Sequence, residues 1–280
     1  MVATLSRPAV GERASAMTSA PLLSLTGISK RFVSSRHDTT AVDNLSLDMR
    51  VGEFVCVVGP SGCGKSTLLN IVAGLDHADA GEALFDSRPI KGAGAERVVV
   101  FQDAALYPWL NVRANVEFGL KVKGVRGKER RVAVDRYLEL VNLRKFERAY
   151  VHELSGGMKQ RVQLARALAV EPRMLLMDEP FAALDAQTRD VLQEELQEIW
   201  LRTGATILFI THNVREAALL ADRVIVMTPS PGRIKAEISV PLQRPRDIDT
   251  HAVVDFAAEI RRELQHDEYT SKASATGYVI

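Results

Sequence analysis

The sequence predicts an α/β fold in which helices cover a mostly parallel sheet. Apolar strand-like runs alternate with stretches of helical periodicity, which is the pattern of α/β domains. A helix is expected at Lys65–Ala73, where it is stopped by Gly74. The strand-like runs are nearly continuous in apolar residues, as in strands that are buried on both faces. These runs are Phe54–Val58, Val98–Phe101, Met174–Met177, Ile207–Ile210 and Val224–Met227.

Composition limits the class of protein. The 280 residues suffice for one large α/β domain or two small ones. Hydrophobic residues make up 46% and charged residues 25%, which excludes fibrous, collagen-like and wholly disordered proteins. The net charge of +1 gives no global attraction for nucleic acid, so no nucleic-acid partner is expected. Cys56 and Cys63 cannot form a disulfide framework and indicate reduced thiols in a cytosolic compartment.

The beginning and the middle of the chain depart from this pattern. No apolar run reaches roughly 18 residues, so no bilayer-spanning segment is expected. Residues 1–21 lack the apolar region of a secretory signal and are expected to be a disordered leader, with a transit peptide as the alternative. Strand signals vanish between about residues 103 and 171, which predicts a helical subdomain with helices at Glu129–Leu143 and Lys159–Ala169.

The last part of the chain is expected to return to the sheet and then leave it. Pro229–Gly232 reads PSPG, a turn signal that leads into a predicted strand at Ile234–Val240. Residues 22–247 would then form the main domain, and residues 248–280 a C-terminal helical tail. One docking helix is expected in the tail before the chain frays, because apolar residues recur there at helical spacing. They are Val253, Phe256, Ile260 and Leu264.

A phosphate-binding loop is the strongest motif of the sequence. Residues 59–66 read GPSGCGKS, which matches GxxxxGK[ST] between an apolar strand and a helix. Lys65 would place its charge on the β and γ phosphates, Ser66 would bind Mg²⁺, and Thr67 would hold an α-phosphate oxygen. The strand and helix around the motif argue against a chance glycine-rich turn, and Cys63 is interpreted as a tolerated small side chain. The expected nucleotide contacts are Gly59, Pro60, Ser61, Gly62, Cys63, Gly64, Lys65, Ser66 and Thr67.

Two carboxylates end a later apolar strand. Asp178 and Glu179 follow the MLLM run at the end where ligands bind to open α/β sheets. Asp178 could hold Mg²⁺ through water, and Glu179 could polarise an attacking water. An ordinary strand-to-turn transition is the alternative, and the phosphate loop in the same chain makes it less favoured.

A second anion-binding terminus is expected at residues 154–158, which read LSGGM. Ser155 can cap the following helix, and Gly156 and Gly157 leave its first N–H groups accessible. A capped helix start without a ligand is the alternative. Together with the phosphate loop, however, two anion sites in one chain suit a dimer that sandwiches nucleotide.

These motifs, in this order, resemble an ATP-binding cassette (ABC) ATPase over about residues 22 to 240. The resemblance implies a P-loop NTPase (RecA-like) core with a helical subdomain and an antiparallel β subdomain. It also implies ATP and Mg²⁺ as ligands. The matching positions are the Walker A loop Gly59–Ser66, the Q-loop Gln102, the signature Leu154–Met158, the Walker B strand Met174–Asp178, the D-loop 183–185 and the switch histidine His212.

The resemblance implies a role for each of several further residues. Phe32 would stack on adenine, and Gln102 would sense Mg²⁺ and the attacking water. Asp185 would organise a dimer interface in which Ser155 and Gly157 touch the γ-phosphate that the other copy holds. His212 would contact the γ-phosphate, with Lys65, Gln102 and Glu179 as the other catalytic residues. Met158 and Asn213 depart from the commonest family residues at positions without a chemical role.

Finer features resemble importers of nitrate, sulfonate, taurine and similar small anions. They are the segments 107–112, 154–158, 178–189 and 231–234. This resemblance implies integral-membrane permease partners, a solute-binding protein as an indirect partner, and a peripheral place on the cytoplasmic face of the inner membrane. The aromatic-rich cluster of residues 106–110, with Tyr107 and Trp109, would then dock on the permease, whereas chemistry alone equally allows it to fill the helical subdomain's own core.

Three other functions use similar motifs. A soluble ABC ATPase of DNA repair or translation would usually carry coiled-coil inserts or two cassettes, and this sequence has no sustained heptads. The ATPase subunit of an exporter is disfavoured by the anion-importer features. A P-loop kinase or GTPase would need neither the 154–158 motif nor His212.

Overall fold

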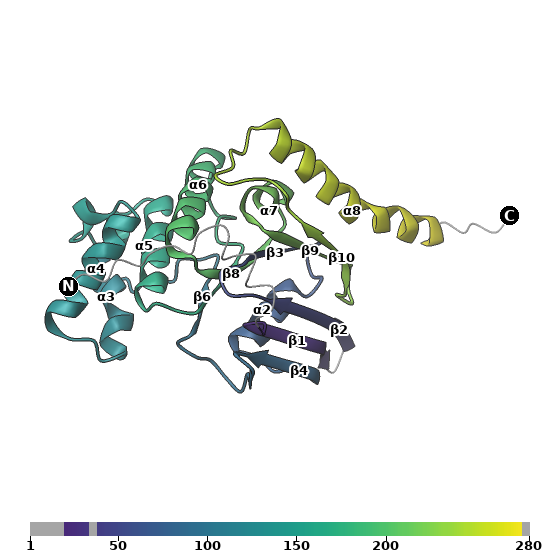
Figure 1. The fold of residues 1–280 in the computed structure, drawn as a ribbon, viewed down its shortest axis with the longest axis horizontal. Helices are drawn as coiled ribbons and strands as arrows, with labels where there is room; N and C mark the ends of the chain where they lie inside the picture. Colours follow the sequence, from purple (N-terminus) through teal and green to yellow (C-terminus); the bar gives the residue numbers. More distant parts are fainter. Residues whose placement is uncertain (1–19, 34–37, 276–280) are drawn as a thin grey trace.

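The computed structural model describes residues 20–33 and 38–275, with side chains described up to residue 265. A six-stranded sheet forms its centre, in the order β10-β9-β3-β8-β7-β6 (Figure 1). The first five of these strands along the chain are parallel, and β10 is antiparallel to β9. The strands are β3 (Phe54–Val58), β6 (Arg97–Val100), β7 (Met174–Asp178), β8 (Thr206–Thr211), β9 (Arg223–Met227) and β10 (Ile234–Ser239).

All the predicted strands are present, and their ends differ from the predicted ends by no more than one residue. The strand expected at Val98–Phe101 begins one residue earlier, because Arg97 pairs with Met174 of β7. Phe101 lies beyond the strand with 42% of its surface exposed. The last strand ends at Ser239, so Val240 is not part of it. The strands β3 and β8 are buried along their whole length, as their unbroken apolarity predicts.

A second, antiparallel sheet covers the helix that follows β3. The order of this sheet is β2-β1-β4-β5, and its strands are β1 (Leu23–Val33), β2 (Asp38–Met49), β4 (Ala80–Phe85) and β5 (Arg88–Pro89). The predicted helix α2 (Lys65–Ala73) is confirmed and ends at Gly74 in the left-handed conformation. Figure 1 shows α2 between the two sheets. Its apolar side chains share one buried cluster with both sheets, which fixes the start of the helix at the carboxyl edge of β3.

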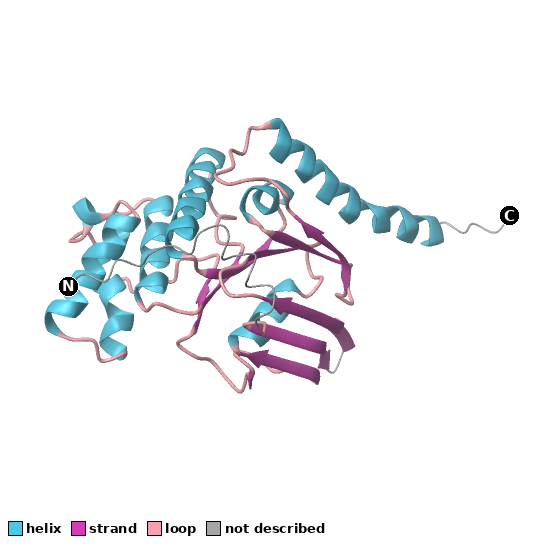
Figure 2. Cartoon of the chain, viewed as in Figure 1, coloured by secondary structure: helices cyan, strands magenta, loops and turns pink. Residues whose placement is uncertain are grey.

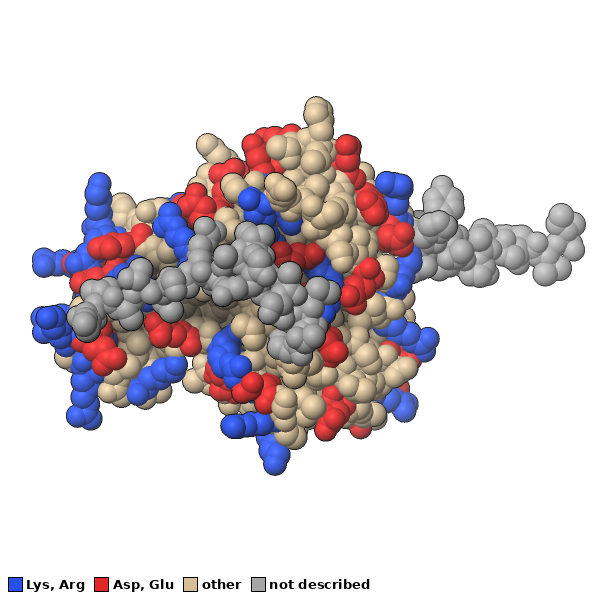
Figure 3. Space-filling model, viewed as in Figure 1, with Lys and Arg blue, Asp and Glu red and all other residues tan. Residues whose placement is uncertain are grey.

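Three α-helices lie between β6 and β7 at one end of the molecule (Figure 2). They are α3 (Val112–Val122), α4 (Gly127–Leu140) and α5 (Gly156–Ala169), with short 3₁₀ turns at Arg144–Phe146 and Val151–Glu153. The helix expected at Glu129–Leu143 therefore begins and ends earlier, and the helix expected at Lys159–Ala169 begins at Gly156, directly after its cap Ser155. Lys and Arg side chains extend from this end on the face drawn in Figure 3.

Three further helices complete the described fold. They are α6 (Ala186–Thr203), α7 (Val214–Leu220) and α8 (His251–Ala275). The expected docking of the tail is confirmed, because Val253, Phe256 and Ile260 are buried and α8 packs on α7. Leu264 is half-buried against the same core, and the carbonyl oxygen of Glu263 accepts from Lys235 of β10. After these contacts α8 extends away from the body (Figure 1).

Of the segments expected to be irregular, residues 1–19 and 276–280 lie outside the described residues. In the described part of the chain, no helix has both the length and the apolarity that a bilayer crossing needs.

Candidate nucleotide-binding site

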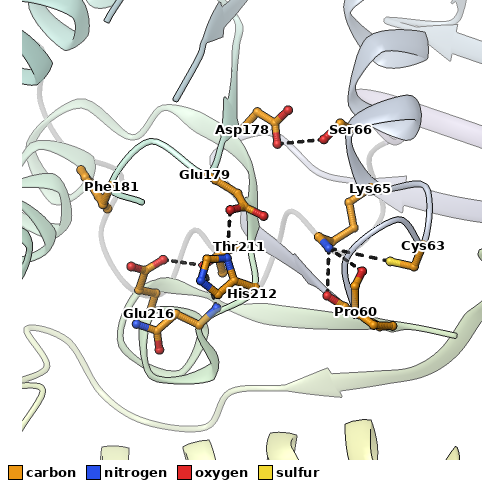
Figure 4. A network of polar contacts seen from close by, with 12 residues as sticks. Pro60, Cys63, Lys65, Ser66, Asp178, Glu179, Phe181, Thr211, His212 and Glu216 are labelled. Atoms are coloured by element: carbon orange, nitrogen blue, oxygen red, sulfur yellow. Dashed lines mark hydrogen bonds and ion pairs between the residues drawn. The ribbon is translucent and has the colours of Figure 1, made fainter. Parts of the chain in front are cut away.

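The phosphate loop joins the end of β3 to the start of α2, as its sequence predicts. Lys65 begins the helix, and its Nζ donates hydrogen bonds to the carbonyl oxygens of Gly59 and Pro60 at 2.8 and 2.9 Å (Figure 4). Gly64 has a φ of 94°, and a Cβ there would lie 2.3 Å from the carbonyl oxygen of Ala41. Only glycine fits both this backbone conformation and this close approach. The loop therefore has the curled geometry that presents backbone N–H groups to phosphate oxygens.

The PSPG turn supports this loop from behind, which the sequence alone did not indicate. The N–H of Gly232 donates to the carbonyl oxygen of Ala41 at 3.0 Å. A Cβ on Gly232 would lie 2.0 Å from the carbonyl oxygen of Cys63. Cys63 is itself buried, and burial raises the pKa of its thiol despite nearby Lys65. Both cysteines are free and buried, in agreement with the prediction of reduced thiols.

Two of the three predicted magnesium ligands lie together. The hydroxyl of Ser66 donates to the Asp178 carboxylate at 3.2 Å, although the two residues are 112 positions apart. Burial raises the pKa of Asp178, because the ionised carboxylate loses contact with water. A positive charge beside this carboxylate would stabilise its ionised form. The third, Gln102, is exposed, and its side chain makes no hydrogen bond to Ser66 or Asp178 within the described residues.

The predicted base and the predicted switch histidine are in direct contact. Nδ1 of His212 lies 2.9 Å from Oε2 of Glu179. They meet because β7 and β8 are parallel neighbours, so the residues that follow them emerge at the same edge. Glu179 has a φ of 44°, an unusual backbone conformation for a residue that is not glycine, and its N–H donates to the Ile210 carbonyl at 3.0 Å.

The second predicted anion site has the expected local geometry but lies apart from the phosphate loop. Ser155 caps α5, and its hydroxyl accepts from the N–H of Met158 at 3.3 Å. Gly157 is buried, and a Cβ there would lie 2.6 Å from the side chain of Thr188. Within the described chain no hydrogen bond joins this segment to residues 59–66, and Figure 1 shows α5 well separated from α2. One copy of the chain therefore does not bring its two anion sites together.

The D-loop aspartate caps α6. Asp185 accepts from the N–H of Thr188 at 3.0 Å, and these hydrogen bonds lower the pKa of the Asp185 carboxyl. The neighbouring backbone is held by Arg189, which donates to the carbonyl oxygens of Phe181 and Leu184 at 3.3 and 2.8 Å. Asp185 is exposed to solvent.

The loop that carries Gln102 is attached to one face of α5. Gln160, Gln163 and Arg166 recur at intervals of three residues and donate to consecutive backbone carbonyls. Gln160 donates to Gln102, Gln163 to Phe101 and Asp103, and Arg166 to Ala104 and Ala105, at distances from 2.7 to 3.4 Å. Hydrogen bonds thus connect the Q-loop to α5, the helix that Ser155 caps.

Two aromatic features lie on the surface. Phe32 on β1 is 46% exposed, and the Lys30 ammonium lies 5.4 Å from its ring centre. Trp109 is 70% exposed, whereas Tyr107 packs against both Trp109 and Phe118, with ring centres 5.6 and 4.5 Å apart. Tyr107 therefore contributes to the packing of the helical lobe, and Trp109 presents its indole to the outside.

Comparison with known proteins agrees with this geometry. The family described as ABC transporter matches residues 42–182. The nitrate import ATP-binding protein NrtD of Synechocystis sp. is 46% identical over 253 residues, which cover 90% of this chain and 94% of that protein. The taurine import ATP-binding protein TauB of Roseobacter denitrificans is 49% identical over 248 residues, which cover 88% of this chain and 89% of that protein.

Solved structures of cassettes share the fold. The ATP-binding cassette MJ0796, in a dimeric post-hydrolysis state bound to ADP and Pi, is 31% identical with a TM-score of 0.68. The match covers 79% of this chain and 100% of the MJ0796 chain. The cbiO1 protein of Clostridium perfringens, part of the ABC transporter complex cbiONQ, is 29% identical with a TM-score of 0.71, covering 80% and 90%. The chain has the P-loop NTPase fold of these cassettes, and it belongs to the ABC transporter family.

Proposed function

We propose that this chain is the ATP-hydrolysing subunit that energises a multi-subunit importer of a small anion such as nitrate, a sulfonate or taurine. The observation that carries the proposal is the convergence of three features at one sheet edge: the phosphate loop, the Ser66–Asp178 pair and the Glu179–His212 pair. The nitrate and taurine import relatives support the solute class.

ATP is held chiefly through its phosphates. The loop N–H groups and the start of α2 bind phosphate oxygens, and Lys65 supplies a positive charge to the β and γ phosphates. Thr67, two residues into the helix, holds an α-phosphate oxygen. Phe32 offers an exposed ring on which adenine stacks, on the antiparallel sheet beside the loop.

The donor set at the loop fits Mg²⁺. A hydroxyl and a carboxylate 3.2 Å apart are hard oxygen ligands of the kind that this ion prefers, and the raised pKa of Asp178 reflects a buried carboxylate that a cation would stabilise. Ser66 and Asp178 would hold the ion, with Gln102 as a further oxygen donor. When bound, it neutralises charge on the β and γ phosphates.

Hydrolysis needs an oriented water and charge stabilisation at the γ-phosphate. Glu179 accepts a proton from the attacking water or orients it. His212 contacts the γ-phosphate, and its hydrogen bond to Glu179 fixes the relative position of the two side chains. The positioning of these groups, more than covalent chemistry, accelerates phosphoryl transfer.

A second copy of the chain completes each site. Ser155 and Gly157 of one copy contact the γ-phosphate bound by the other, and Asp185 contributes to the interface between them. The separation of the two anion sites within one chain and the dimeric state of the related cassette support this arrangement. A twofold arrangement is self-complementary, so one kind of chain forms two equal sites.

Permease subunits in the membrane respond when the two copies join around bound ATP. The exposed Trp109, next to the α5-bound loop of Gln102, is suited to contact a cytoplasmic loop of a permease. The chain would then lie peripherally on the cytoplasmic face of the inner membrane, with a solute-binding protein as an indirect partner. Co-purification of the full chain with a permease tests this partner assignment.

Glu179→Gln tests the catalytic assignment. The variant keeps the shape of the side chain but cannot accept a proton, so ATP should bind while turnover falls by about 100-fold or more. Size-exclusion chromatography with Mg²⁺-ATP should show a trapped dimer. Glu194→Gln, an exposed change on α6, is the matched control and should hydrolyse ATP like the wild type. Wild-type turnover in Glu179→Gln would remove this residue from the role of base.

A further inference from the structure

A buried polar network lies directly behind His212. Glu216, on the first turns of α7, is only 5% exposed. Its Oε2 accepts a hydrogen bond from the hydroxyl of Thr211 at 2.5 Å, and its Oε1 accepts from Nε2 of Gln193 at 3.0 Å (Figure 4 shows Thr211, His212 and Glu216). A buried carboxylate must be hydrogen-bonded to be tolerated, and both of its oxygens are used here.

The same network fixes the backbone on both sides of His212. The Thr211 hydroxyl that donates to Glu216 also accepts from the N–H of Asn213 at 2.9 Å. Thr211 is the last residue of β8 and is 2% exposed, so its own position is set by the sheet. The hydroxyl thus joins Glu216 to the N–H of Asn213, on either side of His212, whose own side chain is 62% exposed.

The helix α7 is held against α6 at both ends. At its start, Gln193 of α6 binds Glu216. At its end, the guanidinium of Arg246 donates to the carbonyl oxygens of Ala218, Leu219 and Ala221. The backbone of Arg246 is in turn bonded twice to Gln197, one turn after Gln193 on α6, at 2.7 and 2.8 Å. Glu216 is therefore held by Gln193 of α6 and by the anchoring of its own helix.

We propose that Glu216 is a positioning residue for ATP hydrolysis, which acts through the Thr211 hydroxyl to hold His212 against Glu179. This inference rests on the proposed function, since it assigns a task within the same reaction. Glu216 does not touch the site: the path runs from its carboxylate to Thr211, then to the Asn213 N–H, and so to the backbone of His212. Misplacement of a catalytic group by about 1 Å costs on the order of 100-fold in rate, so loss of the Thr211 contact should lower the rate of hydrolysis.

Thr211→Val is the primary test, because valine keeps the shape of threonine and removes only the hydroxyl. The expected result is a kcat lower by about 10-fold to 100-fold with a KM for ATP within about 2-fold of the wild type, since the phosphate loop is untouched. Thr211→Ser restores the hydroxyl and should recover most of the kcat. Thr203→Val, which removes a hydroxyl bonded to the Ile199 carbonyl on α6, is the matched control and should have no effect on kcat.

A spectroscopic readout separates positioning from general destabilisation. The chain has 6 histidines, so the imidazole Cε1–H signal of His212 can be identified by its loss in His212→Gln. In Thr211→Val this signal should move or broaden while the other histidine signals stay in place. Thr203→Val should leave every histidine signal unchanged.

A second pair of variants decides the question if Thr211→Val fails to fold. Glu216→Gln can keep both contacts once the Gln193 amide turns over. Its oxygen then accepts from Thr211, and its NH₂ donates to Gln193 Oε1, a buried atom with no hydrogen-bond partner in the described structure. Its kcat should stay within about 3-fold of the wild type. Glu216→Asp shortens the side chain by one methylene and loses the reach to Thr211, so its kcat should fall about 10-fold or more.

The outcomes distinguish this inference from the proposed function. If Thr211→Val or Glu216→Asp folds and keeps a wild-type kcat with an unmoved His212 signal, the positioning role is overturned. A folded Glu216→Gln with a kcat as low as that of Glu216→Asp also overturns it, because hydrogen-bonded support would then not be the contribution of this residue. If the wild-type chain itself hydrolyses no ATP in its complex, the proposed function fails instead.

Discussion

At the scale of single residues, close backbone contacts shape the nucleotide site as much as the motif side chains do. Gly232 lies more than 160 positions after the phosphate loop, yet its backbone bonds to Ala41 and its Cα faces the carbonyl of Cys63. The motif residues Lys65, Asp178 and Glu179 could be found from sequence because their spacing and strand context carry the signal. Gly232 and Thr211 could not, because their partners come from distant segments that only the folded sheet brings together.

Gly232→Ala should weaken nucleotide binding. The added methyl would lie 2.0 Å from the Cys63 carbonyl, so the loop must shift. We expect the affinity for ATP to fall by about 10-fold or more, a penalty of about 1.4 kcal/mol, in a direct binding titration. Gly92→Ala is the control, because a Cβ there meets no atom within 4 Å. Equal affinities in the two variants would show that the turn does not support the loop.

At the scale of elements, the predictable parts are those whose pattern is unbroken. The buried strands β3, β7 and β8 are runs of apolar residues, so the sequence located them to within a residue or two. The strands β1 and β2 are not among the strands that the apolar pattern predicts. In β1 the pairing shifts register between Leu25 and Ile28 and again near Lys30, which interrupts the alternation of inward and outward side chains. In β2, residues 45–49 do alternate between buried and exposed, so a strand signal was present there. Their sheet was expected only from the family resemblance.

The attachment of the Q-loop to α5 is an element-scale contact that can be measured. Arg166 donates to the carbonyls of Ala104 and Ala105 and lies 5.5 Å from the centre of the Tyr107 ring. Arg166→Met should lower the free energy of unfolding by about 2 to 4 kcal/mol, because two carbonyls lose a charged donor. Arg136→Met on α4, whose ion pair with Glu171 is exposed, should cost less than about 1 kcal/mol in the same denaturant titration. Similar losses in both variants would contradict a structural role of this attachment.

At the scale of the whole molecule, the two predicted anion sites lie in distant parts of the fold. The phosphate loop lies beside the antiparallel sheet, and Ser155 caps α5, one of the helices between β6 and β7. The sequence predicts both motifs, but only the fold shows that one chain keeps them apart (Figure 1). The distance between the two regions, and not either motif alone, therefore supports the proposed pairing of two copies.

Mixing two inactive variants tests this division. Lys65→Ala lacks phosphate binding, and Ser155→Arg blocks the second anion site, so each should be inactive alone. A mixed dimer would contain one intact composite site, and random pairing should restore roughly a quarter of the wild-type ATPase sites. Replacing the Ser155→Arg partner by the double variant leaves no intact site and is the control. If the mixture is as inactive as its control, the two halves of the site do not come from different copies.

The left-handed backbone at Glu179 has a consequence for how this protein can change. A side chain with a Cβ costs about 1 kcal/mol or more in that conformation, and glycine would remove the strain. At position 179, glycine would therefore favour stability, whereas the proposed catalytic role requires glutamate. Under the proposed role of Glu179 as the base, a substitution that raises thermal stability here would remove the carboxylate that turnover needs.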